Sequence, residues 1–262
     1  MTNDSSDLKK FLVFYRICAV LLALSIIAVL LLTLSYMPPF GSPDNPTNNE
    51  VYSRYVEQGV NDTGAINIVA GMIFDYRAFD TLGESFVLFV AVMFVIMLIR
   101  ITSDSSGAQA AQVSSVIKNK NDGVQQPLIL KSVVIITVPF ILVYGVYVIF
   151  NGHLSPGGGF SGGTILGAGI SLWAIAFGAE KVRKIFNFKT YTLSCFFALL
   201  FYALVKGYSF FMGASGRSTG IPLGIPGTIL SAGLILPLNI CVGIVVACTV
   251  YTLYALFSEG EV

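Results

Sequence analysis

Charged residues are scarce in this chain. Asp, Glu, Lys and Arg make up 11% of its 262 residues, hydrophobic residues make up 55%, and the mean hydropathy is +0.80. A typical soluble domain carries about 25% charged residues. The composition therefore indicates an integral membrane protein. The net charge is +1, without a basic arm or stripe, so the sequence gives nucleic-acid binding no support.

Metal-binding and catalytic patterns are also missing. The chain has one histidine, and its four cysteines lie in apolar runs without the CxxC spacing of a zinc or iron–sulfur site. They are expected to be reduced packing residues: Cys18, Cys195, Cys241 and Cys248. No nucleophile–base arrangement and no phosphate-binding loop is present. We therefore expect no metal, no cofactor and no enzymatic activity in this chain by itself.

Long apolar runs are abundant. A helix needs about 20 apolar residues to cross the membrane, so the sequence predicts an all-α integral membrane protein with about six transmembrane helices. Their expected bounds are 11–36, 81–100, 128–150, 160–179, 190–212 and 228–257. Residues 65–74 are too short to span and predict a half-helix capped by Asp62, with Asn67, Gly71 and Asp75 on one face.

A polar stretch divides these runs. Residues 102–127 are rich in Ser, Gln, Asn and Lys, which predicts a flexible cytoplasmic linker. We therefore expect a two-helix module at 1–101 and a four-helix module at 128–262. Pro237 lies inside the last predicted helix, where it would free the carbonyl of Gly233 and kink or tilt the helix.

The lysines and arginines predict the orientation. With the N-terminus inside, the outer loops hold only Arg54, Arg77 and Arg217, and Lys206 lies within a span. The inner segments hold all the others: Lys9, Lys10, Arg16, Arg100, Lys118, Lys120, Lys131, Lys181, Arg183, Lys184 and Lys189. Inner loops are enriched in these residues. We therefore expect a multi-pass protein of the cell's inner (plasma) membrane with both ends in the cytoplasm.

The only histidine lies in a glycine-rich stretch, residues 151–163, between two spans. Glycine permits tight turns, and irregular backbone at membrane depth must pack against protein or line a wet cavity. The stretch predicts a tight re-entry loop that leads straight into the next helix. His153 could transfer protons or simply hydrogen-bond loop carbonyls. Gly163, Gly167 and Ser171 form a small-residue stripe suited to close helix packing.

Ionisable side chains gather where the second span begins. Asp75, Asp80 and Glu84 could relay protons or coordinate a cation, because carboxylates at the membrane edge have these properties. The alternative is structural. Thr81-x-x-Glu84 matches a helix-capping box, and Arg77 with Asp80 could form an ion pair. That alternative leaves Asp75 unexplained.

Lys206 lies about two-thirds along the fifth span. A lysine near the centre of a membrane helix costs about 2.5–3.5 kcal/mol. The position therefore suggests a buried partner or a water-filled path, and Glu180 and His153 are candidate partners. Alternatively, Lys206 could extend outward past a shorter hydrophobic segment.

At these residues the chain resembles a known family. The motif reads Gly152-His153-x-x-Pro156-Gly157-Gly158-Gly159-Phe160-x-Gly162-Gly163. It is similar to the signature of the MnhB/MrpB family of the multisubunit Mrp-type sodium/proton antiporters, over about residues 128–262. Residues 67–84 and the preceding 38–41 look like the small module at the C-terminal end of the large MrpA-type antiporter protein. In the related membrane-bound hydrogenases these modules are separate subunits.

The resemblance implies an accessory subunit of a larger ion-translocating complex, because the long antiporter domain of the family is absent. Asp75, Asp80 and Glu84 inherit a place on the cation or proton route by implication, and Lys206 and His153 complete the candidate pathway residues. The implied partners are large antiporter-like subunits, small membrane subunits, sodium ions, protons and the lipid bilayer. No cofactor is implied for this chain.

Other functions stay open. The same module could serve a redox-driven ion pump, such as a membrane-bound hydrogenase-type complex, whose other subunits carry the redox centres. It could also be a passive scaffold whose small-residue helices pack neighbouring subunits. A stand-alone channel is disfavoured, because the predicted helices offer few polar faces to line a pore.

Overall fold

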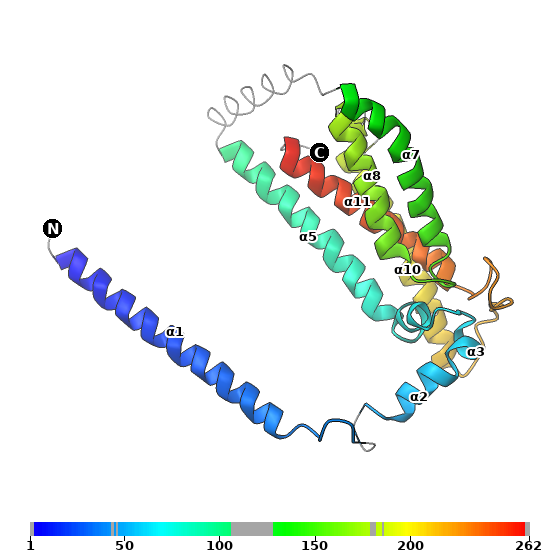
Figure 1. The fold of residues 1–262 in the computed structure, drawn as a ribbon, viewed down its shortest axis with the longest axis horizontal. Helices are drawn as coiled ribbons and strands as arrows, with labels where there is room; N and C mark the ends of the chain where they lie inside the picture. The colour runs from blue at the N-terminus through cyan, green and yellow to red at the C-terminus, as the bar shows by residue number, and fades with distance from the viewer. Residues whose placement is uncertain are drawn as a thin grey trace. The chain divides into compact units, whose positions relative to one another are not determined.

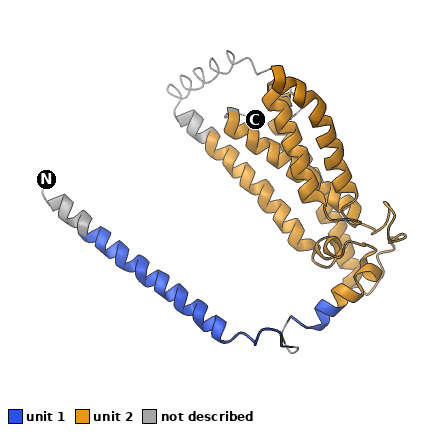
Figure 2. Cartoon of the chain, in the orientation of Figure 1, with its two compact units in different colours: residues 1–53 blue, residues 54–262 orange. Residues whose placement is uncertain are grey.

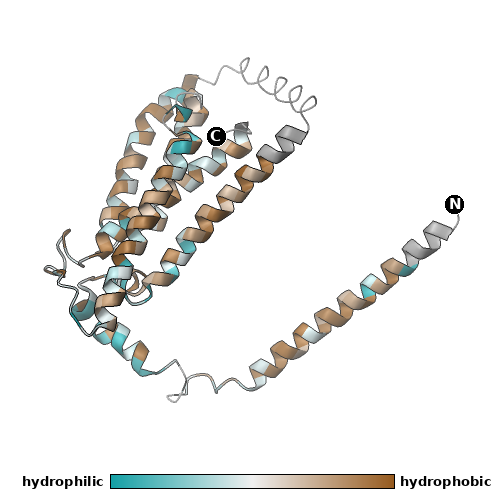
Figure 3. Cartoon of the chain, turned by 180° about the vertical axis from the view of Figure 1, so that it is seen from behind, coloured by the Kyte–Doolittle hydropathy of each residue, from teal (hydrophilic) through white to brown (hydrophobic). Residues whose placement is uncertain are grey.

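The computed structural model describes residues 3–42, 45, 47–105, 128–178, 182–184 and 186–259. These residues form helices and connecting turns, without strands. Among the described residues, six helices are long and apolar enough to cross a membrane. Figure 3 colours the residues of the long helices mostly brown, which marks them as hydrophobic. The predicted class, an all-α membrane protein with about six spans, is confirmed. The chain forms two compact units, residues 1–53 and 54–262 (Figure 2).

The first unit is dominated by one helix, α1 (Asn3–Ser35), whose residues 10–35 could span the membrane. Three of its hydroxyl side chains are satisfied within the helix. The hydroxyls of Ser25, Thr33 and Ser35 each donate a hydrogen bond to the carbonyl three residues earlier. The hydroxyls therefore do not interrupt the apolar surface that a membrane helix needs.

The second unit is built around its last helix, α11 (Ile235–Glu259). This helix packs against α5 (Ala78–Ser105), α7 (Leu128–Phe150), α8 (Gly159–Phe177) and α10 (Phe188–Ala214), as Figure 1 shows. More than half of its membrane span is buried, in contrast to the other spans. The core of the unit therefore lies along α11.

Glycines let α8 approach its neighbours closely. A Cβ at Gly163 would lie 2.7 Å from the carbonyl oxygen of Gly243 on α11, and one at Gly167 would lie 2.7 Å from Cβ of Val250. On the other side, a Cβ at Gly162 would lie 2.5 Å from Cγ1 of Ile149 on α7. The small residues of α8 thus serve close packing against both α7 and α11.

The last helix begins later than the sequence predicts. Residues 228–234 lie in turns and bends instead, and α11 begins at Ile235. Pro237 therefore lies in the first turn, where a backbone N–H has no helical partner, so it does not kink the helix. Two residues before the helix, Ala232 and Gly233, have φ of 64° and 52°. Such left-handed backbone cannot continue a helix, which hydropathy alone did not reveal.

Short elements precede α5. They are α2 (Glu50–Glu57), α3 (Gly59–Thr63), α4 (Ile68–Gly71) and the π-helical turn η1 (Met72–Tyr76). Asn67, rather than the predicted Asp62, caps α4, since its side chain accepts from the N–H groups of Val69 and Ala70. Asp62 lies within α3, which ends at Thr63 and is followed by Gly64 with φ of 70°, so Asp62 cannot reach α4 as a cap.

The predicted linker begins slightly later as well. Helix α5 continues to Ser105, so residues 102–105 are helical. The remainder of the linker, residues 106–127, lies outside the described residues, as does Glu180.

Candidate functional site

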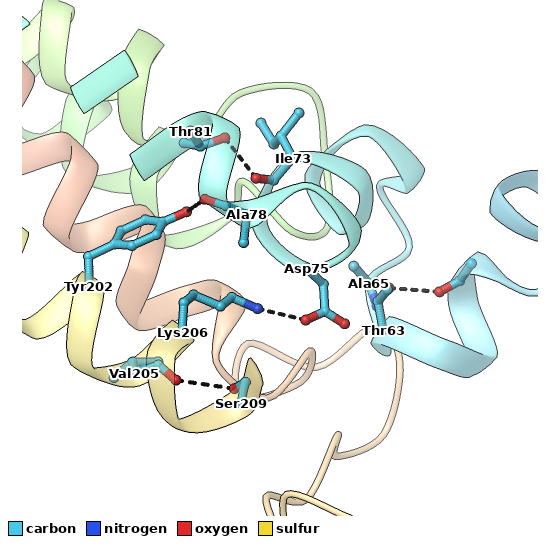
Figure 4. Close-up of polar contacts among 11 residues, drawn as sticks. Thr63, Ala65, Ile73, Asp75, Ala78, Thr81, Tyr202, Val205, Lys206 and Ser209 are labelled. Carbon is cyan, nitrogen blue, oxygen red and sulfur yellow. Dashed lines mark hydrogen bonds and ion pairs between the residues drawn. The ribbon is translucent and has the colours of Figure 1, made fainter. Parts of the chain in front are cut away.

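The site is built on the π-helical turn η1. Its wider hydrogen bond runs from the N–H of Arg77 to the carbonyl of Met72, at 2.8 Å. Thr81 of α5 donates its hydroxyl to the carbonyl of Ile73 at 2.7 Å. Tyr202 of α10 donates its hydroxyl to the carbonyl of Ala78 at 2.9 Å (Figure 4). Thr81 thus bonds the turn itself, and Tyr202 bonds the first residue of α5 just after it. Turns of this kind often occur at functional sites.

This turn places Asp75 beside Lys206. The ammonium Nζ of Lys206, on α10, donates to Oδ1 of Asp75 at 2.7 Å across 131 residues of sequence (Figure 4). The Lys206 side chain is 4% exposed and that of Asp75 is 41% exposed. Lys206 thus has an oppositely charged partner, although this partner is partly exposed rather than buried. The partner is Asp75, whereas His153 contacts Thr228 instead.

Within the pair, the Lys206 side chain is buried and the Asp75 side chain is partly exposed. A buried ammonium is costly unless an opposite charge lies beside it, and Asp75 supplies that charge. The half-exposed carboxylate can also meet a proton or a cation from outside the protein. Protonation of Asp75 would remove its charge and weaken its hold on Lys206. Binding of a proton or a cation to the Asp75 carboxylate can therefore change how strongly that carboxylate holds the Lys206 ammonium.

The other predicted acidic residues stand apart from this pair. Asp80 accepts from Nε of Arg77 at 2.6 Å, and both side chains are more than half exposed. Glu84 lies exposed on α5. Thr81 does not cap α5, because the helix begins at Ala78 and the Thr81 hydroxyl bonds the π-helical turn. The capping-box alternative is therefore wrong, while the Arg77–Asp80 ion pair is present.

The glycine-rich loop leads directly into α8. Gly157 and Gly158 have φ of 146° and 131°, which side-chain-bearing residues rarely adopt. The first N–H of the helix, at Gly159, donates to Oδ1 of Asn239 at 2.8 Å. Helix α8 is thus capped by a side chain of α11. Pro156 lies exposed on the loop, and Phe160 packs against the core along α11.

His153 is fully buried beneath this loop. Its Nε2 lies 3.3 Å from the carbonyl of Thr228. A carbonyl only accepts, so we assign the proton to Nε2. Its Nδ1 has no hydrogen-bond partner among the residues that the structure describes. This is the loop-carbonyl geometry that the sequence left open, and it is separate from the Asp75–Lys206 pair.

A second polar cluster surrounds Tyr76, the residue after Asp75, and sequence reasoning missed it. The Tyr76 hydroxyl donates to Oδ2 of Asp62 at 2.7 Å, and Nε of Arg54 lies 3.1 Å from the same oxygen. The hydrogen bonds from Tyr76 and Arg54 lower the pKa of Asp62. Burial, together with the neighbouring carboxylate, raises the pKa of Tyr76 to about 12. No sequence spacing signals this contact, because two turns and a helix separate its members.

Two family models match separate parts of the chain. Residues 129–252 match a domain related to the MnhB subunit of the Na+/H+ antiporter, and residues 15–113 match MbhE, a subunit of MBH. The chain is also 31% identical, over 230 residues, to an uncharacterized protein of Methanocaldococcus jannaschii, covering 83% of this chain and 84% of that protein. It is a multi-pass membrane protein and belongs to the family that carries the MnhB-related domain.

Two solved structures are similar. One is the membrane-bound sulfane sulfur reductase, an archaeal respiratory membrane complex, with a TM-score of 0.64 and 25% identity, covering 91% of this chain and 96% of the matched chain. The other is the Mrp complex from Dietzia sp. DQ12-45-1b, with a TM-score of 0.61 and 21% identity. That match covers 93% of this chain and 26% of the matched chain, and it shows the fold alone.

Proposed function

We propose that this protein is an accessory membrane subunit of an Mrp-type cation/proton antiporter complex, and that Asp75 and Lys206 lie on its ion or proton route. The observation that carries the proposal is the ion pair itself. A half-exposed carboxylate meets a buried ammonium inside a membrane domain. Buried ionisable groups in membrane helices typically mark ion pathways. The MnhB-related domain and the similarity to the Mrp complex support the same assignment.

The pair suggests how cation and proton movement could be coupled. A proton, a sodium ion and the Lys206 ammonium would compete for the same carboxylate oxygens of Asp75. Arrival of one displaces another, because each binds the same negative charge. Asp75 would then exchange ions at its open side, while Lys206 responds on the buried side. Glu84, exposed on α5, would extend the route toward partner subunits or the solvent.

A redox-driven pump is the second candidate host complex. The similarity to a respiratory reductase complex, over nearly the whole of both chains, favours it. In that setting the pair keeps its role, and electron transfer in other subunits supplies the energy. A passive scaffold is the third candidate, supported by the close glycine packing of α8. A scaffold would not require the ion pair.

We also propose the modular organisation. The first module comprises residues 1–101 and the second residues 128–262, and the linker between them is shorter than the predicted 102–127, because α5 continues to Ser105. The two separate family matches support this division. Both termini would lie on the cytoplasmic side of the inner (plasma) membrane, as the distribution of lysine and arginine indicates. The chain would carry out no catalytic step itself, and its partners would be the other subunits of the complex.

The route is tested by measuring cation/proton exchange in membrane vesicles that contain the assembled complex. Asp75→Asn should reduce exchange by about 100-fold, the lower range for removal of a proton-transfer group. Glu57→Gln is the matched control, because it removes an equivalent charge from an exposed side chain outside the candidate route, and it should leave exchange nearly unchanged. Unchanged exchange in assembled Asp75→Asn complexes would reject the route and favour the scaffold.

A further inference from the structure

Asn67 joins the glycine-rich loop to the helix that precedes Asp75. Its side-chain Nδ2 donates to the carbonyls of Gly152 at 2.9 Å and Ser155 at 3.1 Å. Its backbone N–H donates to the carbonyl of His153 at 3.0 Å. Its Oδ1 meanwhile accepts from the first free N–H groups of α4. One residue thus binds the loop, 85 to 88 residues away, and caps the short helix at the same time.

The loop is a fixed support for this contact. The His153 side chain lies on the carbonyl of Thr228, and Asn239 of α11 accepts from Gly159 at the end of the loop. A Cβ at Gly152 would lie only 2.6 Å from Cα of Gly158, so the loop is folded tightly on itself. Contacts within the second module therefore hold its carbonyls in place in addition to Asn67.

The short helix transmits that position to Asp75. Helix α4 ends at Gly71, and η1 follows without a break from Met72. Gly71 is closely packed, since a Cβ there would lie 2.8 Å from Oγ1 of Thr63. A displacement of the helix start at Asn67 would consequently move the turn that carries Asp75.

We infer that Asn67 is a positioning residue for the Asp75–Lys206 pair, and that the glycine-rich loop sets the place of Asp75 through it. The role of the pair in transport rests on the proposed function. The positioning of Asp75 by Asn67 does not rest on it, so the positioning role and the transport role can fail separately. The glycine-rich loop then holds a residue of the first module in register with α10 of the second.

The test is residue-resolved acetylation of Lys206 in the intact complex in native membranes, followed by mass spectrometry. A membrane-permeant acetylating reagent is the probe, and the exposed Lys189 is the internal reference. Asn67→Asp is the informative variant. It keeps the oxygen that caps α4, as Asp is a good cap. It replaces the two N–H donors with oxygen, which the loop carbonyls cannot bond.

Burial and the contact with Asp75 shield Nζ of Lys206 in the wild type. Asn67→Asp should speed its acetylation by about tenfold, the factor expected from losing the bonds to the loop. Asp75→Asn should also speed it, and adding Asn67→Asp to that variant should have no further effect. The combined variant separates a positioning role, which acts through Asp75, from a general structural one.

An unchanged acetylation rate in Asn67→Asp would overturn the inference, as would an equal increase in the Asp75→Asn background. If Asn67→Asp does not assemble, Asn67→Ser replaces it, because serine keeps a capping oxygen but cannot reach the loop. The same acetylation results for Lys206 then support or overturn the positioning role. Normal exchange in Asp75→Asn, together with the expected acetylation pattern, would reject the proposed route and leave the positioning role in place.

Discussion

Lys206 and Asp75 differ sharply in their exposure at the surface of this chain. The lysine is buried within α10, while the aspartate is open on one side. Removing either partner leaves the other alone, but the consequences are unequal. An unpaired charge that water can reach costs little, whereas one that water cannot reach costs a great deal.

Asp75→Asn should therefore destabilise the protein by about 3 kcal/mol, the lower range for an uncompensated buried charge. Lys206→Met should cost about 1 kcal/mol or less, because methionine fills a buried site and leaves only a hydrated carboxylate. The double variant should resemble Lys206→Met. Thermal denaturation of the purified complex measures the three values. Equal losses in the two single variants would contradict the asymmetry.

Acid should weaken the contact between Asp62 and Tyr76. The hydrogen bond from Tyr76, and then Arg54, lowers the pKa of Asp62 in the folded state. A lowered folded pKa gives stability that is present above the unfolded value, about 3.9, and is lost as the pH falls through the folded value. Tyr76 keeps its proton throughout this range, because its pKa is raised to about 12.

Tyr76→Phe should accordingly lower the melting temperature at pH 7, and the difference from wild type should vanish well below about pH 4. The measurement is melting temperature against pH. Tyr55→Phe is the matched control, since the Tyr55 ring stacks on Tyr76 with centroids 4.5 Å apart and no hydrogen bond of its hydroxyl occurs among the described residues. A Tyr76→Phe difference that persists unchanged in acid would contradict the account.

Helix α8 depends on the absence of side chains along two faces. Gly163→Ala would place a methyl group 2.7 Å from a backbone carbonyl of α11. It should destabilise the protein by about 1–3 kcal/mol, as overpacking does. Gly207→Ala on α10 is the control, because no atom lies within 4 Å of its added Cβ. It should stabilise by about 0.5–1 kcal/mol. Thermal denaturation compares them, and equal effects would refute the packing argument.

The N-terminus of α8 depends on a residue from another helix. Asn239→Ala should leave the buried N–H of Gly159 without a partner and cost about 1–3 kcal/mol. Asn187→Ala is the comparison, since Asn187 caps α10 locally and is exposed. That loss should be about 1 kcal/mol, because water can replace the cap. Denaturation midpoints measure both, and a smaller loss for Asn239→Ala would contradict the capping role.

Hydropathy was enough to predict the spans, because each crossing helix requires its own apolar run. It placed the start of the last helix at residue 228, whereas α11 begins at Ile235, because residues 228–234 are mostly apolar and only local backbone conformation distinguishes them from the helix. The π-helical turn was equally hidden, because hydropathy signals neither the bond from Thr81 to the carbonyl of Ile73 in the turn nor the bond from Tyr202 to Ala78 just after it. The cost of Lys206 in a membrane helix predicted a partner, but 131 residues separate it from Asp75.

At the scale of the molecule, the two proposed modules share their polar contacts. Asp75 binds Lys206, Tyr202 binds the carbonyl of Ala78, and Asn67 binds the glycine-rich loop. Residues 54–262 accordingly form one compact unit. Joining the modules in one chain keeps both halves of the ion pair in the same polypeptide.

The central claim is that this chain works as one component of a larger ion-translocating complex. The most direct measurement is purification of the tagged protein from its native membrane in mild detergent, with identification of every polypeptide that copurifies. We predict large antiporter-like subunits with small membrane companions. Iron–sulfur or hydrogenase-like subunits in addition would identify the host as a redox-driven pump. Recovery of the protein alone and monodisperse would contradict the account.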